Sequence, residues 1–253
     1  AHDRGIYTYQ RSLNNFNNTT FSKIRTYDML GGNPYISFWK CVLLIECVKM
    51  INQNEPHIQV QSFLDIVDAL QRNGFLAADN DISVTVTKLV ESDSALSIKS
   101  VFQHNRKYTT DTELHGAEEI YAAIKNSIKD VYINARFLLI IDGLDDILNN
   151  TEFKAEIITG LIRAVDEINR VFKKTTLSIK VLILIRDDIL NLCRDPNLSK
   201  IVRDSGIRLQ WDIPDNPFDS DLLQLVEKRI DDASGSHNSF VQMWEEVFPE
   251  TIG

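Results

Sequence analysis

Three aspartates follow a run of apolar residues in the middle of the chain. Phe137-Leu-Leu-Ile-Ile141 leads directly into Asp142, and Asp145 and Asp146 follow in the next turn. A continuous apolar run of this length is typical of a strand buried in a parallel sheet, and it would deliver the carboxylates to one edge of that sheet. Carboxylates so placed can hold Mg²⁺ bound to phosphates. We therefore predict that Asp142 binds Mg²⁺, directly or through water, and that Asp145 or Asp146 positions an attacking water.

An arginine occupies the equivalent place after a second apolar run. Val181-Leu-Ile-Leu-Ile185 is followed by Arg186. Ligands of open parallel sheets bind at the carboxyl ends of the strands, so Arg186 and Asp142 are expected at the same sheet edge. There Arg186 could sense or neutralise a γ-phosphate. The alternative interpretations are a capped turn after Asp142 and a salt-bridged turn at Arg186-Asp-Asp188.

The pattern that usually completes such a nucleotide site is not in this sequence. A glycine-rich loop, G-x-x-x-x-G-K-[ST], supplies backbone N–H groups and a lysine to the phosphates, and the printed chain contains no such pattern. Its five histidines are scattered and its three cysteines suggest neither a zinc site nor a disulfide framework. The cysteine usage fits a reducing cytoplasm, where we expect the protein to be located.

The elements that must position these residues follow from hydrophobic periodicity. The two apolar strands, joined by an amphipathic helix at 152–172, predict a βαβ crossover. The fold class is therefore α/β, a three-layer sandwich with a mainly parallel sheet. Further helices are predicted at 34–52, 60–71, 115–133, 220–230 and 239–247, and further strands at 23–30 and 207–211. A small β-hairpin insertion is predicted around 80–112, because Ile82-Ser-Val-Thr-Val-Thr87 alternates with period two.

These elements divide the chain into three regions. Residues 1–22 form an N-terminal polar segment with a short helix around Tyr7–Leu13, 23–230 form the α/β core, and 231–253 begin a C-terminal helical region.

Composition limits the class of protein. The content is globular, and the net charge of −9 argues against a generally basic surface for nucleic acid. The longest apolar run, Cys41–Ile51, is interrupted by Glu46 and Lys49 and falls far short of the roughly 20 residues that span a bilayer. No secretory signal pattern is present, and the start at alanine predicts that Ala1 is not the natural first residue.

The motif at 137–146 resembles the Walker B signature of the signal-transduction ATPases with numerous domains, the STAND branch of P-loop ATPases. Val181–Arg186 resembles the sensor-1 strand of the same family, with its terminal arginine. Other segments are similar to one bacterial subgroup of P-loop ATPases, which includes defence-associated proteins. They are Tyr35-Ile-Ser-Phe-Trp-Lys40, the Ile207–Trp211 segment with its following helix, and Trp244-Glu-Glu-Val-Phe248. The resemblance covers about residues 25–250.

This resemblance implies a nucleotide-binding ATPase core of STAND or related AAA+-like type, with ATP and Mg²⁺ as cofactors. It also implies that nucleotide state controls homo-oligomerisation or an attached effector domain or protein partner, in a role that includes bacterial antiviral defence. The family's phosphate loop lies before the aligned region and a later sensor element after it. The first strand and phosphate loop are therefore expected upstream, and residues 1–253 alone are not expected to hydrolyse ATP efficiently. A nucleic-acid partner stays open, although charge does not indicate one; no membrane partner is expected.

Two other functions remain open. A non-hydrolysing interaction scaffold that keeps the sheet without the chemistry would explain the missing phosphate loop. A Mg²⁺-dependent phosphoesterase or nuclease could use the acidic cluster without that loop, although no further acid and lysine fall into a recognisable nuclease pattern.

Overall fold

A computed structural model describes residues 5–13, 34–76, 81–91, 116–144, 153–209 and 220–234. The chain divides into two compact units, residues 1–205 and 206–253. Several predictions fall outside the described residues: the strand at 23–30, the second half of the hairpin insertion, the helix at 239–247, and the aspartates Asp145 and Asp146.

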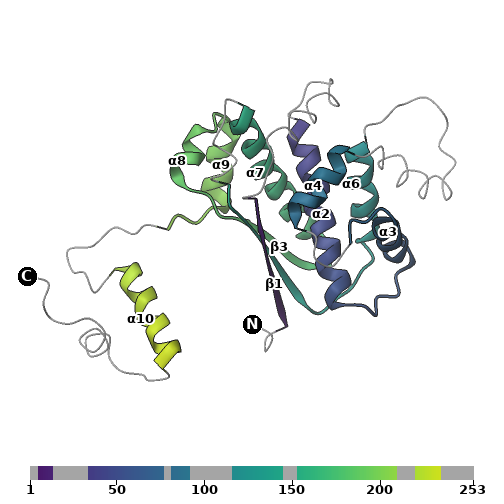
Figure 1. The fold of residues 1–253 in the computed structure, drawn as a ribbon, viewed down its shortest axis with the longest axis horizontal. Coiled ribbons are helices and arrows are strands. Elements are labelled where there is room, and N and C mark those ends of the chain that lie inside the picture. The colour runs from purple at the N-terminus through teal and green to yellow at the C-terminus, as the bar shows by residue number, and fades with distance from the viewer. Residues whose placement is uncertain are drawn as a thin grey trace, which may run out of the picture. The chain divides into compact units, whose positions relative to one another are not determined.

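Three parallel strands form the sheet of the first unit (Figure 1). They are β1 (Ile6–Ser12), β2 (Arg136–Asp142) and β3 (Ser178–Ile183), in the order β1-β2-β3. In the register, Leu139 of β2 lies between Tyr9 of β1 and Val181 of β3. The parallel sheet and the α/β class predicted from the sequence are confirmed, and β2, which carries Asp142, is the central strand.

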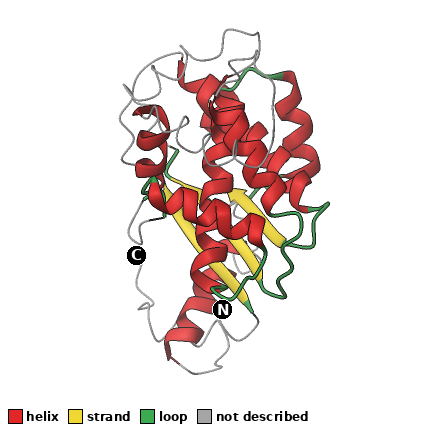
Figure 2. Cartoon of the chain, turned by 90° about the vertical axis from the view of Figure 1, so that its right-hand side faces the viewer, coloured by secondary structure: helices red, strands yellow, loops and turns green. Residues whose placement is uncertain are grey.

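Both connections within the sheet are helical. The connection from β1 to β2 contains α2 (Pro34–Asn54), α3 (Gln61–Arg72), α4 (Ile82–Glu91) and α6 (Gly116–Ser127), and α7 (Phe153–Phe172) joins β2 to β3. Because both connections step in the same direction across the sheet, right-handed crossovers place their helices on one face. Figure 2 is viewed from that side and shows the strands passing behind the helices.

The two faces of the sheet differ accordingly. On the helical face Phe137, Leu139 and Ile141 of β2 are buried. On the other face Lys180 and Leu182 of β3 are exposed. Among the described residues no crossover helix covers this second face, the open face of the sheet, so the third layer of the predicted sandwich stays a prediction.

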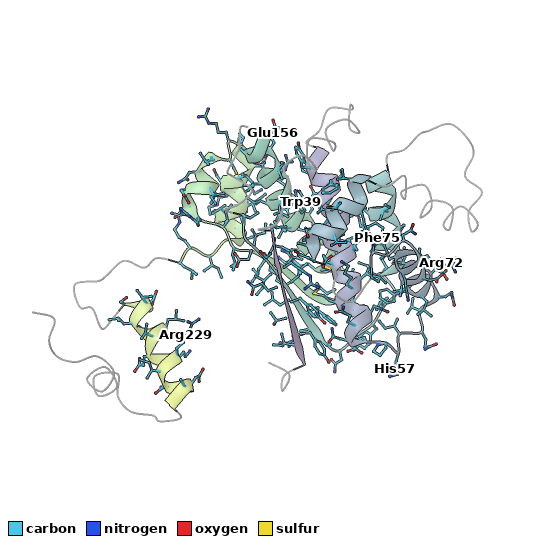
Figure 3. All side chains as sticks on the ribbon, in the orientation of Figure 1. Trp39, His57, Arg72, Phe75, Glu156 and Arg229 are labelled. Carbon is cyan, nitrogen blue, oxygen red and sulfur yellow. The ribbon has the colours of Figure 1, made fainter. Side chains whose placement is uncertain are left out.

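The core is centred on α2, which is buried on all sides from Cys41 to Ile51 and is apolar there except at Glu46 and Lys49. Trp39 is fully buried and its indole Nε1 donates a hydrogen bond to the carbonyl of Ile157 at 3.1 Å (Figure 3). The close packing of α2 on α7 depends on Gly160, because a Cβ there would lie 2.6 Å from Cβ of Tyr35. These contacts fix α7 against α2, and α7 in turn packs on β3.

The first unit ends with two short helices, α8 (Asp187–Leu192) and α9 (Pro196–Ser205), of which α9 packs against α7. In the second unit α10 (Asp221–Ser234) confirms the helix predicted at 220–230. The helices predicted at 34–52, 60–71 and 152–172 are also confirmed, with ends that differ by at most two residues, and the helix predicted at 115–133 is confirmed only as far as Ser127.

Three predictions of secondary structure are wrong. Tyr7–Leu13 does not form a helix, because residues 6–12 are strand β1, in which alternate residues face the core. Residues 82–87 do not form a hairpin strand but begin α4, where Ile82 and Val86 are buried at helical spacing. Ile207 and Leu209 are exposed and belong to a described stretch, 206–209, without regular structure.

Candidate functional site at the carboxyl edge of the sheet

The main chain around Asp142 is fixed on both sides. Asp142 pairs with Ser12 of β1, and its carbonyl accepts a hydrogen bond from the N–H of Leu13 at 2.8 Å. On the other side the N–H of Leu184 donates to the carbonyl of Ile141 at 2.9 Å. The hydrogen-bond ladder thus extends to the very end of β2, so the position of Asp142 is set by the sheet.

The carboxylate of Asp142 is partly exposed and accepts a hydrogen bond on each oxygen. Oδ1 accepts from the N–H of Gly143 at 2.7 Å, and Oδ2 accepts from Nε2 of Gln10 at 3.1 Å. Gly143 adopts a φ of 78°, a left-handed conformation that favours glycine and turns the chain away from the strand. Each carboxylate oxygen has a second lone pair, so these bonds leave acceptor capacity for a cation.

Arg186 lies just past β3, at the start of α8 and at the same edge as Asp142. Its guanidinium donates two hydrogen bonds to Asp188, from Nε to Oδ1 at 3.1 Å and from Nη2 to Oδ2 at 2.7 Å. These bonds hold the pKa of Asp188 below its ordinary value. This is the salt-bridged turn of the alternative interpretation. Both side chains are exposed, so the pair is weakly held and another anion could replace Asp188.

The structure therefore brings Asp142 and Arg186 to one edge of the sheet, while Asp145 and Asp146 lie outside the described residues. Among the described residues, no three side chains of His, Cys, Asp or Glu are close enough together to hold a metal ion. Mg²⁺ does not require three protein ligands, because it is usually bound by one or two carboxylates together with substrate phosphates and water. Asp142 fits such a role as a single carboxylate ligand.

Sequence reasoning missed Gln10, which reaches Asp142 from a strand that was expected to be a helix. It also missed a buried polar cluster formed by Arg11, Glu46, Lys49 and Thr85, hereafter the Glu46 cluster. The alternation of tyrosines and Arg11 along 7–11 is the signal that could have identified β1, because period two is that of a strand.

The Glu46 cluster ties β1 to α2 and α4. Oε2 of Glu46 accepts from Nε of Arg11 at 2.8 Å, and Oε1 accepts from Nζ of Lys49 at 2.6 Å and from Oγ1 of Thr85 at 2.8 Å. Nζ of Lys49 also donates to Oγ1 of Thr85 at 2.7 Å. Burial lowers the pKa of Lys49, and the Glu46 carboxylate opposes that change. The cluster therefore anchors the carboxyl end of β1 from the helical face, next to Gln10 on the opposite face.

Comparison with protein-family models, with curated proteins and with solved structures found no match to this chain. Within the described part of the chain, no helix is both long and apolar enough to cross a membrane.

Proposed function

We propose that this chain is the core of a nucleotide-binding ATPase of the P-loop class, of STAND or related AAA+-like type, acting in the cytoplasm with ATP and Mg²⁺. Its nucleotide state controls homo-oligomerisation or an attached effector, in a role that includes bacterial antiviral defence. The observation that carries the proposal is the placement of Asp142 at the end of the central parallel strand, with Arg186 after the neighbouring strand at the same edge. A carboxylate for the metal and a cation for the phosphate are thus supplied by adjacent strands.

Each residue has a definite task in this proposal. Asp142 offers one carboxylate oxygen to Mg²⁺, whose own charge neutralises the phosphates. Arg186 leaves the exposed Asp188 and binds the γ-phosphate, an exchange of one anion for a more highly charged one. Asp145 or Asp146 orients the water that attacks the γ-phosphorus. The phosphate loop that such chemistry needs is not in the printed sequence, so the proposal requires that it be supplied by another part of the protein.

The test is ATP binding and turnover by the full product of the gene. Asp142→Ala and the double variant Asp145→Ala/Asp146→Ala are each expected to lower turnover by at least about 100-fold, the scale of losing a transition-state electrostatic contact. Asp130→Asn is the matched control, because Asp130 is exposed in the turn after α6, away from the carboxyl edge. Wild-type turnover in Asp142→Ala would overturn the assignment of Asp142, and turnover by residues 1–253 alone would overturn the account of where the phosphate loop lies.

A second candidate function is a non-hydrolysing interaction scaffold. It is favoured by the bidentate bond between Arg186 and Asp188, in which the guanidinium has a partner within its own turn. The same experiment separates the two functions: a scaffold binds no ATP at millimolar concentration in the presence of Mg²⁺, and a gene product lacking G-x-x-x-x-G-K-[ST] throughout would favour it.

A further inference from the structure

Gln10 is the side chain that contacts the Asp142 carboxylate from the neighbouring strand. In the register of the sheet Gln10 pairs with Ile140, so Asp142 lies diagonally across from it on the same face. A long side chain can span this diagonal between adjacent strands. The hydrogen bond from Nε2 of Gln10 to Oδ2 of Asp142, at 3.1 Å, joins residues that are 132 positions apart in the sequence.

The chemistry of this contact suits a carboxylate that has to bind a cation. An ionised carboxylate only accepts hydrogen bonds, and a glutamine amide can donate without carrying charge. A lysine or arginine at the same place would also donate, but it would neutralise the carboxylate and repel the metal. The nearest cation on β1, Arg11, is held by Glu46 on the opposite face. The Gln10 contact therefore holds one oxygen of Asp142 without placing a positive charge beside it.

The hydrogen bond between Gln10 and Asp142 is exposed to solvent. Gln10 is exposed, and the bond lies at the open face of the sheet rather than in the core. An exposed hydrogen bond adds little to stability, because water replaces it at small cost. Its loss should therefore change the orientation of Asp142 without changing the stability of the fold.

We propose that Gln10 is a positioning residue, which holds the Asp142 carboxylate in the orientation that binds a divalent cation. This inference rests on the proposed function, since the cation is the one that accompanies ATP. Residues that orient a metal-binding carboxylate typically account for about 10- to 100-fold in metal affinity. Gln10→Met keeps the length of the side chain and removes the donor, and Thr8→Val, on the same face of β1, is the matched control.

The experiment is a titration with Mn²⁺, which accepts the same oxygen ligands as Mg²⁺ and is measured directly by electron paramagnetic resonance. It uses the full gene product, both without nucleotide and with a non-hydrolysable ATP analogue that supplies phosphate oxygens, as wild type, Gln10→Met, Thr8→Val, Asp142→Asn and the double variant Gln10→Met/Asp142→Asn. Gln10→Met is expected to weaken Mn²⁺ binding about 10-fold. Thr8→Val should match wild type, and Gln10→Met should have no further effect in the Asp142→Asn background. The urea midpoints of Gln10→Met and Thr8→Val should agree.

The outcomes test the positioning role of Gln10 separately from the proposed ATPase function. Wild-type affinity in Gln10→Met, or an equal loss with and without Asp142, would overturn the positioning role. A loss of affinity accompanied by a matching loss of stability would assign Gln10 a purely structural role. If wild type binds Mn²⁺ through Asp142 and Gln10 as expected but binds no ATP, the proposed function fails while the positioning role stands. If Asp142→Asn binds Mn²⁺ as well as wild type, both fail.

Discussion

Replacing Glu46 with glutamine is expected to destabilise the protein more than any exchange of a surface charge. The Glu46 side chain is fully buried, with a relative exposure of 0%, and accepts hydrogen bonds from Arg11, Lys49 and Thr85. In Glu46→Gln the carboxylate charge is lost, and an amide NH₂ faces groups that are themselves donors. Lys49, at 3% exposure, is then left as a buried cation without its counter-charge. Breaking a buried ion pair by removing one partner costs about 3–5 kcal/mol, and we expect a loss in that range.

The assay is urea unfolding followed by circular dichroism, with the free energy of unfolding extrapolated to zero denaturant. Asp68→Asn is the matched control, because Asp68 forms an ion pair with Arg72 at 2.6 Å on the exposed surface of α3. That pair is expected to contribute only about 0.3–0.5 kcal/mol. The double variant Glu46→Leu/Lys49→Met should be more stable than Glu46→Gln, since it removes the buried cation as well. A loss below about 1 kcal/mol for Glu46→Gln, the range of exposed pairs, would refute this account of the cluster.

Three further predictions concern the core. Burial lowers the pKa of Lys49, so just below the ordinary value of 10.5 the unfolded chain binds more protons than the folded one. The free energy of unfolding should therefore rise as pH increases toward 10.5. Lys49→Met should remove that part of the pH dependence, measured by urea unfolding. Gly160→Ala should lower the free energy of unfolding by about 1–3 kcal/mol, because its Cβ would meet Tyr35, and an unchanged urea midpoint would contradict the packing described here. A thiol reagent should modify the half-buried Cys193 at least about tenfold faster than Cys47, because complete burial raises the pKa of the Cys47 thiol. The two rates can be measured by peptide mass spectrometry, and equal rates would contradict the burial of Cys47.

The parts of the fold that could be predicted are those in which a single period dominates. The apolar strand before Asp142 and the helix 153–172 have unmistakable patterns, and both were placed to within a few residues. Strand β1 was missed because its alternate residues Thr8 and Gln10 lie on the open face of the sheet, which makes the segment look polar. Helix α4 was missed because its β-branched residues favour a strand, a local preference that burial of one helical face overrides.

The candidate site was predicted in the same partial way. Asp142 and Arg186 could be placed at one edge because each follows an apolar strand, and strand ends in a parallel sheet share an edge. The contact of Gln10 with Asp142 could not be predicted, because it depends on which strand pairs with β2 and in what register. The ion pair between Glu46 and Arg11 could not be predicted for the same reason. Only the pair of Glu46 with Lys49, three residues apart on one helix, can be expected from the sequence.

The most direct test of the central claim is the affinity of the full gene product for ATP, measured by calorimetry with Mg²⁺ and with excess chelator. If Asp142 holds the metal that accompanies ATP, Mg²⁺ should tighten ATP binding by at least about 10-fold in wild type and in Asp130→Asn. Asp142→Asn should lose that gain while keeping its affinity for ATP in chelator. An equal gain from Mg²⁺ in Asp142→Asn and in wild type would contradict the claim.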